Sequence, residues 1–184
     1  MLDAKPRARW TVLDRLTYAL GVGLGSGLSP RAPGTAGSLA VLLLMPLWLL
    51  LGPVFSLLVM LAMSVLGIWV CGHTARLMGV HDDGRIVWDE FCGQSLALWP
   101  SVQFWCSLDT QAAWHFAGLA DIVVAFLSFR LFDIWKPFPI GWLDRQVDGG
   151  LGIMLDDILA GIFAGLVVWF WLVFGRAAPW GLVQ

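Results

Sequence analysis

The chain alternates between apolar runs and polar segments rich in glycine, proline and charged residues. Two uncharged runs, Val54–Cys71 and Ile158–Gly175, approach the roughly 20 residues that cross a bilayer as a helix. Three weaker runs are Leu39–Leu51, Phe91–Cys106 and Ala112–Phe132. The pattern predicts an all-α integral membrane bundle of about five hydrophobic helices, in a single domain over residues 1–184. For Leu39–Leu51, a crossing, a re-entrant segment and a buried helix all stay open.

The polar segments predict a topology. They are Gly21–Ser38, Gly72–Glu90 and Asp133–Asp157, and the short turns Gly52-Pro53 and Ser107–Gln111 separate the remaining apolar runs. If all five runs cross, the three polar segments share one side of the membrane. Nearly all Lys and Arg residues lie on that side, which the positive-inside rule assigns to the cytoplasm. Ahead of the first run, Thr11–Leu24 has the pattern of an amphipathic helix.

Composition supports the membrane class. The chain has 184 residues, of which 59% are hydrophobic and 13% charged, whereas a soluble domain has about 25% charged residues. The net charge of −2 says little about nucleic acid, but no basic stripe is present, so no nucleic-acid partner is expected. The acidic and basic N-terminus does not have the pattern of a signal peptide. The isolated residues Cys71, Cys92 and Cys106 are expected to be reduced, buried thiols.

The first segment with chemical potential is GSGLSPRAPGTAGSL, residues 25–39. It precedes a helix expected to begin near Gly37-Ser38. Backbone N–H groups at a helix N-terminus attract anions, and glycine lets a phosphate approach the backbone closely. Arg31 would add a bidentate contact. The alternative is an ordinary loop in which Ser38 caps the helix.

Acidic residues recur at the ends of the apolar runs. Asp89 and Glu90 precede one run, and Asp156 and Asp157 follow a glycine-rich stretch, expected to be a loop, before the last run. Such acids can complement a helix dipole, but adjacent carboxylates repel each other unless a cation or proton lies between them. Mg²⁺ typically binds one or two carboxylates together with water and substrate phosphate.

A third segment, FRLFDIWKPFPI, combines both charges. Arg130, Asp133 and Lys136 are spaced by three and would line one side of a helix end, which Pro137 and Pro139 terminate. The alternative is a snorkelling arginine and lysine with an exposed ion pair.

Acids and cations together at one membrane surface indicate metal-assisted phosphoryl transfer, because acids hold a hard metal and cations hold a phosphate. The rival from another class is a small transporter with Asp121 and Arg130 as intramembrane charges. Clustering of the charges at one surface argues against it. Asp121 is then expected to pair with His115 or Arg130 inside the bundle.

The segments GSGLSPRAPGTAGSL, GVHDDGRIVWDEFCG, FRLFDIWKPFPIGWLDR and GGLGIMLDDILAG, in this order, resemble the phosphatidylglycerophosphatase A family. The resemblance runs from about Gly21 to about Gly165. It implies an all-helical, Mg²⁺-dependent phosphatase of the bacterial inner membrane. The implied reaction removes the terminal phosphate of phosphatidylglycerophosphate and leaves phosphatidylglycerol, so the partners are an anionic phospholipid and the membrane.

The resemblance also implies a site. Its acidic positions match Asp89, Glu90, Asp133, Asp156 and Asp157, and its basic positions match Arg31, Arg130 and Lys136. We expect Glu90, Asp156 and Asp157 as metal ligands, with Asp89 and Asp133 in support or as base. Arg31, Ser38, Arg130 and Lys136 are expected to bind the substrate phosphate. Water that Mg²⁺ activates and a carboxylate nucleophile both stay open, as does a different lipid phosphate as substrate.

Overall fold

The fold is described from a computed structural model, for residues 10–80, 83–107 and 116–175. Within these residues the regular structure is entirely helical, which confirms the predicted all-α class. The α-helices are α1 (Val12–Gly21), α2 (Pro33–Leu42), α3 (Met45–Met78), α4 (Trp88–Ser107), α5 (Phe116–Trp135), α6 (Ile140–Asp144) and α7 (Gly149–Phe170). A 3₁₀ segment, Gly23–Leu28, follows α1, and a π-helical turn, Trp171–Gly175, continues α7.

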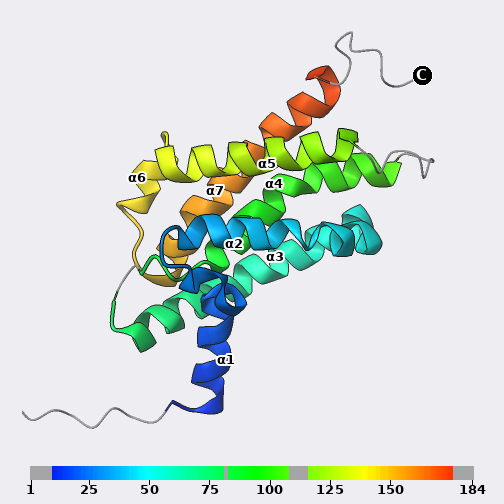
Figure 1. The fold of residues 1–184 in the computed structure, drawn as a ribbon. Coiled ribbons are helices and arrows are strands. Elements are labelled where there is room, and N and C mark those ends of the chain that lie inside the picture. The colour runs from blue at the N-terminus through cyan, green and yellow to red at the C-terminus, as the bar shows by residue number, and fades with distance from the viewer. Residues whose placement is uncertain (1–9, 81–82, 108–115, 176–184) are drawn as a thin grey trace, which may run out of the picture.

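Helix α7 organises the bundle. It runs diagonally through the molecule and packs against α3, α4, α5 and α6 (Figure 1). Helices α2 to α5 run roughly along one direction, whereas α1 stands nearly at right angles to them (Figure 1). The predicted apolar runs therefore form one packed unit.

Glycine brings the helices of the bundle into close contact. A Cβ atom on Gly161 of α7 would lie 2.4 Å from the carbonyl oxygen of Gly93 on α4. One on Gly150 of α7 would overlap the Ile68 carbonyl of α3, at 1.9 Å. Small residues at crossing points are typical of membrane helices, where close backbone approach replaces the hydrophobic effect as a source of association.

The glycine-rich stretch before the last apolar run is helical, so the expectation of a loop there was wrong. Helix α7 begins at Gly149, and Asp156 and Asp157 therefore lie two turns inside it. The prediction failed because glycine is common both in loops and at close helix contacts. Here Gly150 is required by the contact with α3, and the acids belong to the bundle interior.

Two other boundaries differ from expectation. Helix α2 begins at Pro33, a residue favoured in the first turn, so Ser38 lies inside the helix and its Oγ donates to the Gly34 carbonyl at 2.9 Å. The run Leu39–Leu51 is divided between α2 and α3 by a turn at residues 43–44. The predicted turn at Gly52-Pro53 coincides with a break within α3, where Gly52 is non-helical with a φ of 74°. Figure 1 shows the chain running out along α2 and returning along α3.

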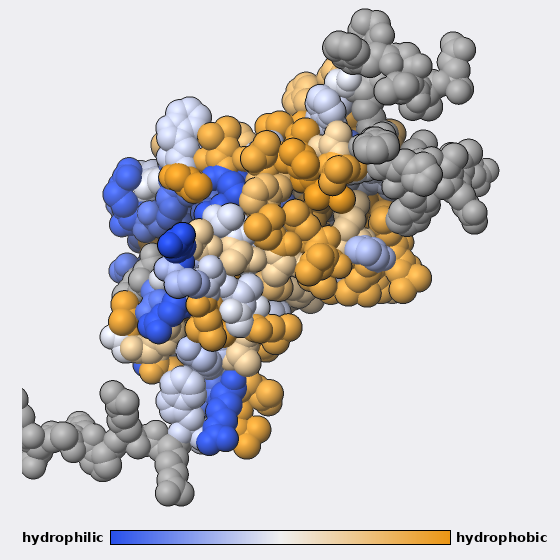
Figure 2. All heavy atoms as spheres, in the orientation of Figure 1, coloured by the Kyte–Doolittle hydropathy of each residue, from blue (hydrophilic) through white to orange (hydrophobic). Residues whose placement is uncertain are grey.

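Among the residues that the structure describes, two helical stretches are long and apolar enough to cross a membrane, namely Met45–Met78 and Gly149–Gly175, with mean hydropathies of 2.5 and 2.3. They contain the two strongest predicted runs. The runs assigned to α4 and α5 also form helices, but whether they cross stays a prediction, and residues 112–115 lie outside the described part. Large apolar side chains cover the surface of the bundle, while polar residues gather at one end (Figure 2).

The cysteines follow the prediction in part. Cys71 and Cys92 are free thiols and buried, as expected. Cys106 is exposed near the end of α4, because this last turn extends beyond the packed core. None of the three forms a disulfide.

Candidate active site

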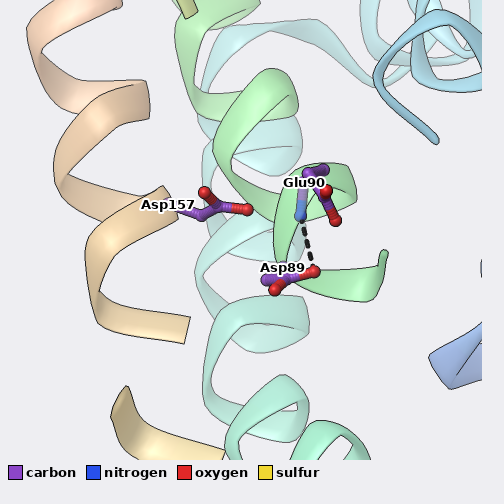
Figure 3. Close-up of side chains that lie close together, drawn as sticks. All are labelled: Asp89, Glu90 and Asp157. Atoms are coloured by element: carbon purple, nitrogen blue, oxygen red, sulfur yellow. Dashed lines mark hydrogen bonds between the residues drawn. The ribbon is translucent and has the colours of Figure 1, made fainter. Parts of the chain in front are cut away.

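Three carboxylates meet where α4 and α7 approach each other. Asp89 and Glu90 lie in the first turn of α4, and Asp157 projects toward them from α7 (Figure 3). One carboxylate oxygen from each residue lies within 4.8 Å of the other two. The close contact of Gly93 with Gly161, one turn further along each helix, sets this approach. The three oxygens form the carboxylate cluster.

The carboxylate cluster is electrostatically costly without a counterion. Burial, and then the neighbouring Glu90 charge, hold the pKa of Asp89 well above its usual range. Burial raises the pKa of Glu90 to about 8; the hydrogen bond with Asp89 opposes this shift, and the Asp157 charge adds to it. Glu90 Oε2 is buried and has no hydrogen-bond partner among the described residues. The cluster therefore has the properties of a cation site.

The N-terminal turn of α2 lies against the carboxylate cluster. A Cβ atom on Gly34 would meet Glu90 Oε1 at 2.2 Å and would lie 3.3 Å from Arg130 Nη1. Arg130 is fixed from two sides, because Nη1 pairs with Asp133 Oδ2 at 2.6 Å and donates to Ser38 Oγ at 3.5 Å. The predicted proximity of Arg130 and Asp133 on one helical face is confirmed. Ser38 is fully buried and contacts Arg130.

Lys136 joins a second acidic group beside the carboxylate cluster. Its Nζ donates to Asp156 Oδ2 at 2.6 Å and to Asp144 Oδ1 at 2.9 Å. Burial alone would lower the pKa of Lys136, but the bonds to Asp156 and Asp144 outweigh it and raise the pKa. Lys136 lies beyond the end of α5, with a φ of 44°. It therefore does not continue the helical side that carries Arg130 and Asp133, although its spacing predicted that it would.

The structure groups the acids differently from the sequence-based expectation. Asp89, rather than Asp156, lies with Glu90 and Asp157 in the carboxylate cluster. Adjacent residues on a helix point about 100° apart, so Asp156 and Asp157 face different neighbours. Asp157 faces α4, whereas Asp156 faces Lys136.

Some features of the site could not be predicted from the sequence. Asp144 lies in the matched segment FRLFDIWKPFPIGWLDR, but its contact with Lys136 depends on the turn through Pro137 to α6. The roles of Gly34 and Gly161 depend on helix crossings that residue spacing does not reveal. Arg31 is exposed in the loop before α2, three residues from Gly34.

Asp121 lies far from this site. It is fully buried, and its two carboxylate oxygens accept hydrogen bonds from Trp105 Nε1 and Trp171 Nε1, both at 2.9 Å. Trp105 is in the last turns of α4, about 22 Å along the helix from Glu90 at 1.5 Å rise per residue. Arg130, one of the two partners expected for Asp121, pairs with Asp133 instead. The other expected partner, His115, lies outside the described residues. Two indole N–H groups thus hold the Asp121 carboxylate inside the bundle, which is a structural role.

A helical bundle that gathers three carboxylates beside an arginine and a lysine defines a candidate enzyme of phosphate-ester chemistry. The comparisons with known proteins agree with this class. The family model described as Phosphatidylglycerophosphatase A matches residues 19–172. The chain therefore belongs to the phosphatidylglycerophosphatase A family and is a phosphatase.

Three curated relatives are similar over most of their length. A protein named Phosphatidylglycerophosphatase A from Escherichia coli K12 is 44% identical over 91% of this chain and 88% of its own. Its namesake from Haemophilus influenzae is 41% identical over 94% of this chain and all of its own. A Bacteroides thetaiotaomicron protein, named provisionally as a phosphatidylinositol-3-phosphatase, is 32% identical over 83% of this chain and 91% of its own. No solved structure gives a significant match.

Proposed function

We propose that the protein is a Mg²⁺-dependent membrane phosphatase that hydrolyses the terminal phosphate of phosphatidylglycerophosphate. The products are phosphatidylglycerol and inorganic phosphate. The observation that carries this proposal is the carboxylate cluster of Asp89, Glu90 and Asp157. The names of two relatives support the substrate, since both are phosphatidylglycerophosphatases.

The residues present fit a magnesium ion. Mg²⁺ prefers oxygen ligands, and the carboxylate cluster offers three carboxylates from two rigid helices. Glu90 Oε2 has no partner in the described protein, so one of its oxygens is available to a cation. Asp89, Glu90 and Asp157 are therefore the proposed ligands. When bound, Mg²⁺ would neutralise phosphate oxygens and help activate water.

The basic residues fit the phosphate. Arg130 lies beside Glu90, and the uncapped N-terminus of α2 lies against the same carboxylate. Lys136 approaches from the side of Asp156 and Asp144. These groups would bind the phosphate monoester and orient its phosphorus, with Arg31 at the entrance.

Hydrolysis then requires one water molecule. Its oxygen forms a bond to phosphorus, the bond from phosphorus to the lipid glycerol oxygen breaks, and that oxygen takes up a proton. Asp133 and Asp156 are the acids next to Arg130 and Lys136, and they hold these cations in place. A carboxylate of the site acting as nucleophile is the alternative route to the same products.

The membrane location is part of the proposal. The apolar helices α3 and α7 would cross the bacterial inner membrane, and the helical runs of α4 and α5 would add further crossings. The polar end in Figure 2 would then face the cytoplasm, in accordance with the excess of Lys and Arg in its loops. The lipid tails can stay in the bilayer while the headgroup reaches the carboxylate cluster.

The test is phosphate release from phosphatidylglycerophosphate by the purified protein in detergent, with Mg²⁺ and with EDTA. We expect release that depends on Mg²⁺ and is abolished in Asp157→Asn, which keeps the shape of the side chain but removes its charge. Metal binding is measured separately through the shift of the melting temperature with Mg²⁺, and Asp157→Asn should lose that shift. Release in EDTA equal to that in Mg²⁺ would refute the metal role.

A second candidate substrate is another lipid phosphate. The name of the Bacteroides thetaiotaomicron relative favours a phosphoinositide. The two substrates are compared through kcat/KM in the same micelles. A higher value for phosphatidylinositol 3-phosphate would replace the first substrate and leave the proposed site unchanged.

A further inference from the structure

Helix α1 contacts the rest of the protein mainly through polar and small residues, together with Leu20 of its last turn, which packs against the core. Asp14 Oδ1 lies 2.8 Å from His73 Nε2 of α3, and Thr74 Oγ1 donates to the Thr17 carbonyl at 3.2 Å. Gly21 lies so close to Thr74 that a Cβ atom would lie 2.3 Å from its Oγ1. The buried residues of α1 are Thr17 and Gly21. Most of the side that faces the protein is therefore polar or small.

The exposed side of α1 is apolar. Val12, Leu13 and Leu16 are 74%, 55% and 60% exposed, and at 100° per residue they share one side of the helix. Arg15, also exposed, lies on a different side. A surface helix in water has the reverse arrangement, with its apolar stripe against the core. We call Val12, Leu13 and Leu16 the α1 apolar face.

The orientation of α1 matches a membrane surface. The helix stands nearly at right angles to α2, α3, α4 and α5, and so would lie parallel to a bilayer that those helices enter (Figure 1). Apolar atoms of α1 face the same way as the apolar body of the bundle (Figure 2). The α1 apolar face is thus turned toward the apolar part of the bundle, which would enter the bilayer.

The basic residues in and before α1 favour an anionic lipid surface. Asp14 is paired with His73, whereas Arg15 is exposed. Lys5, Arg7 and Arg9 precede α1 in the sequence. Basic residues beside an interfacial helix are attracted to anionic lipids by about 1 kcal/mol each.

We propose that α1 lies in the headgroup region of an anionic bilayer, parallel to its plane, with the α1 apolar face buried at the acyl boundary. This inference rests on the membrane location in the proposed function, but not on the reaction. A helix of this kind would hold the site at headgroup depth, because the Gly21 carbonyl at the end of α1 accepts a hydrogen bond of 2.9 Å from Val87 N. Val87 is two residues before Asp89 of the carboxylate cluster.

Spin labels on α1 test this placement directly. The variants Leu16→Cys and Arg15→Cys are made in a Cys106→Ser background, because Cys106 is the exposed cysteine of the described part. The labelled proteins are placed in vesicles of phosphatidylethanolamine and phosphatidylglycerol. Collisions of each label are measured with oxygen, which concentrates in the bilayer, and with a water-soluble nickel chelate. The background protein without an added cysteine is the control for stray labelling.

We expect oxygen collisions to dominate at position 16 and nickel collisions at position 15, so the ratio inverts between neighbouring residues. Dominant nickel collisions at both positions would overturn the proposal. Weak collisions of both kinds at position 16 would also overturn it, because another protein surface would then cover the α1 apolar face. Replacing phosphatidylglycerol with phosphatidylcholine should make the label at position 16 shallower, and an unchanged depth would refute the anionic preference.

A kinetic arm addresses the consequence for the site. Leu16→Glu should raise KM for long-chain substrate in vesicles while kcat/KM for a short-chain, water-soluble substrate stays unchanged. An equal loss of kcat/KM on both substrates would refute a role of α1 in setting the depth of the site. The spin-label ratio does not require phosphatase activity, so failure of the proposed reaction would leave the placement of α1 separately decided.

Discussion

Gly161 lies where α7 crosses α4, and the variant Gly161→Ala tests whether this contact builds the site. A methyl group there would lie 2.4 Å from the Gly93 carbonyl oxygen, whereas folded proteins essentially never show such contacts below 3.0 Å. The helices would have to separate by at least about 0.6 Å. Gly165, one turn further along α7, is the matched control, because its nearest atom, the Leu96 carbonyl oxygen, would be 3.5 Å away.

The expected magnitudes follow from two opposing effects. Alanine is favoured over glycine within a helix by about 1 kcal/mol. Overpacking costs roughly 1–3 kcal/mol. Gly165→Ala should therefore raise the free energy of unfolding by up to about 1 kcal/mol, while Gly161→Ala should lower it by roughly 0–2 kcal/mol.

The same separation should impair the reaction. Asp157 lies one turn before Gly161, and Asp89 one turn before Gly93, so spreading the crossing separates the two acids. Since a displacement of 1 Å can cost about 100-fold in rate, we expect kcat to fall about tenfold or more in Gly161→Ala. Gly165→Ala should keep its kcat.

Both variants are measured by thermal unfolding in detergent and by phosphate release at saturating substrate. The Mg²⁺-induced shift in melting temperature is a third measurement, and it should shrink only in Gly161→Ala. The reasoning is refuted if Gly161→Ala is as stable and as active as Gly165→Ala, because the close approach would then be dispensable.

Three further predictions concern contacts outside the crossing. Asp144→Asn removes one of two carboxylates that hold the Lys136 ammonium, so KM for the lipid phosphate should rise about fivefold, as for an ion pair of ~1 kcal/mol, with kcat little changed. An unchanged KM in phosphate-release assays would contradict it. Asp121→Leu deprives two tryptophan N–H groups of their carboxylate acceptor and should lower the free energy of unfolding by about 2–5 kcal/mol. Asp121→Asn should lower it by less. Equal melting temperatures of all three proteins would show that these hydrogen bonds do not stabilise the fold. The pKa of Asp14 lies below the usual 3.8, through its bonds to Thr11 and a histidine, so its contribution to stability is present above pH 3.8 and is lost below it. The difference in melting temperature between the wild type and Asp14→Asn should therefore close as the pH falls below about 3.8, and a constant difference would exclude this pair as its source.

Much of the site was predictable because its residues are charged and surrounded by apolar sequence. A carboxylate such as Glu90 next to an apolar run needs a partner or a helix N-terminus, so the recurrence of acids at these positions indicated a site. The Arg130 and Asp133 pair followed from helical spacing, and the structure confirms it. These inferences depend on chemistry and local geometry, which the sequence contains.

The partner of each acid was less predictable. Asp156 and Asp157 are neighbours in the chain, yet one contacts Lys136 and the other approaches Asp89. Which acid faces which neighbour depends on how α7 is rotated against α4. That rotation is set by contacts far apart in the sequence, so spacing within one segment does not contain it.

The glycines explain why the depth of the site was misjudged. Glycine lacks a Cβ atom, and this property permits both a turn and a close helix contact, so composition does not distinguish them. At Gly150 the Ile68 carbonyl occupies the place where a Cβ would be, which requires a helix packed against α3. The helix therefore begins two turns before the acids and carries Asp157 into the bundle. An acid at a helix N-terminus would be stabilised by the helix dipole, whereas Asp157 at this depth lies with two other carboxylates and needs a cation or a proton. The glycine that suggested a loop thus accounts for the position of Asp157 among the proposed metal ligands.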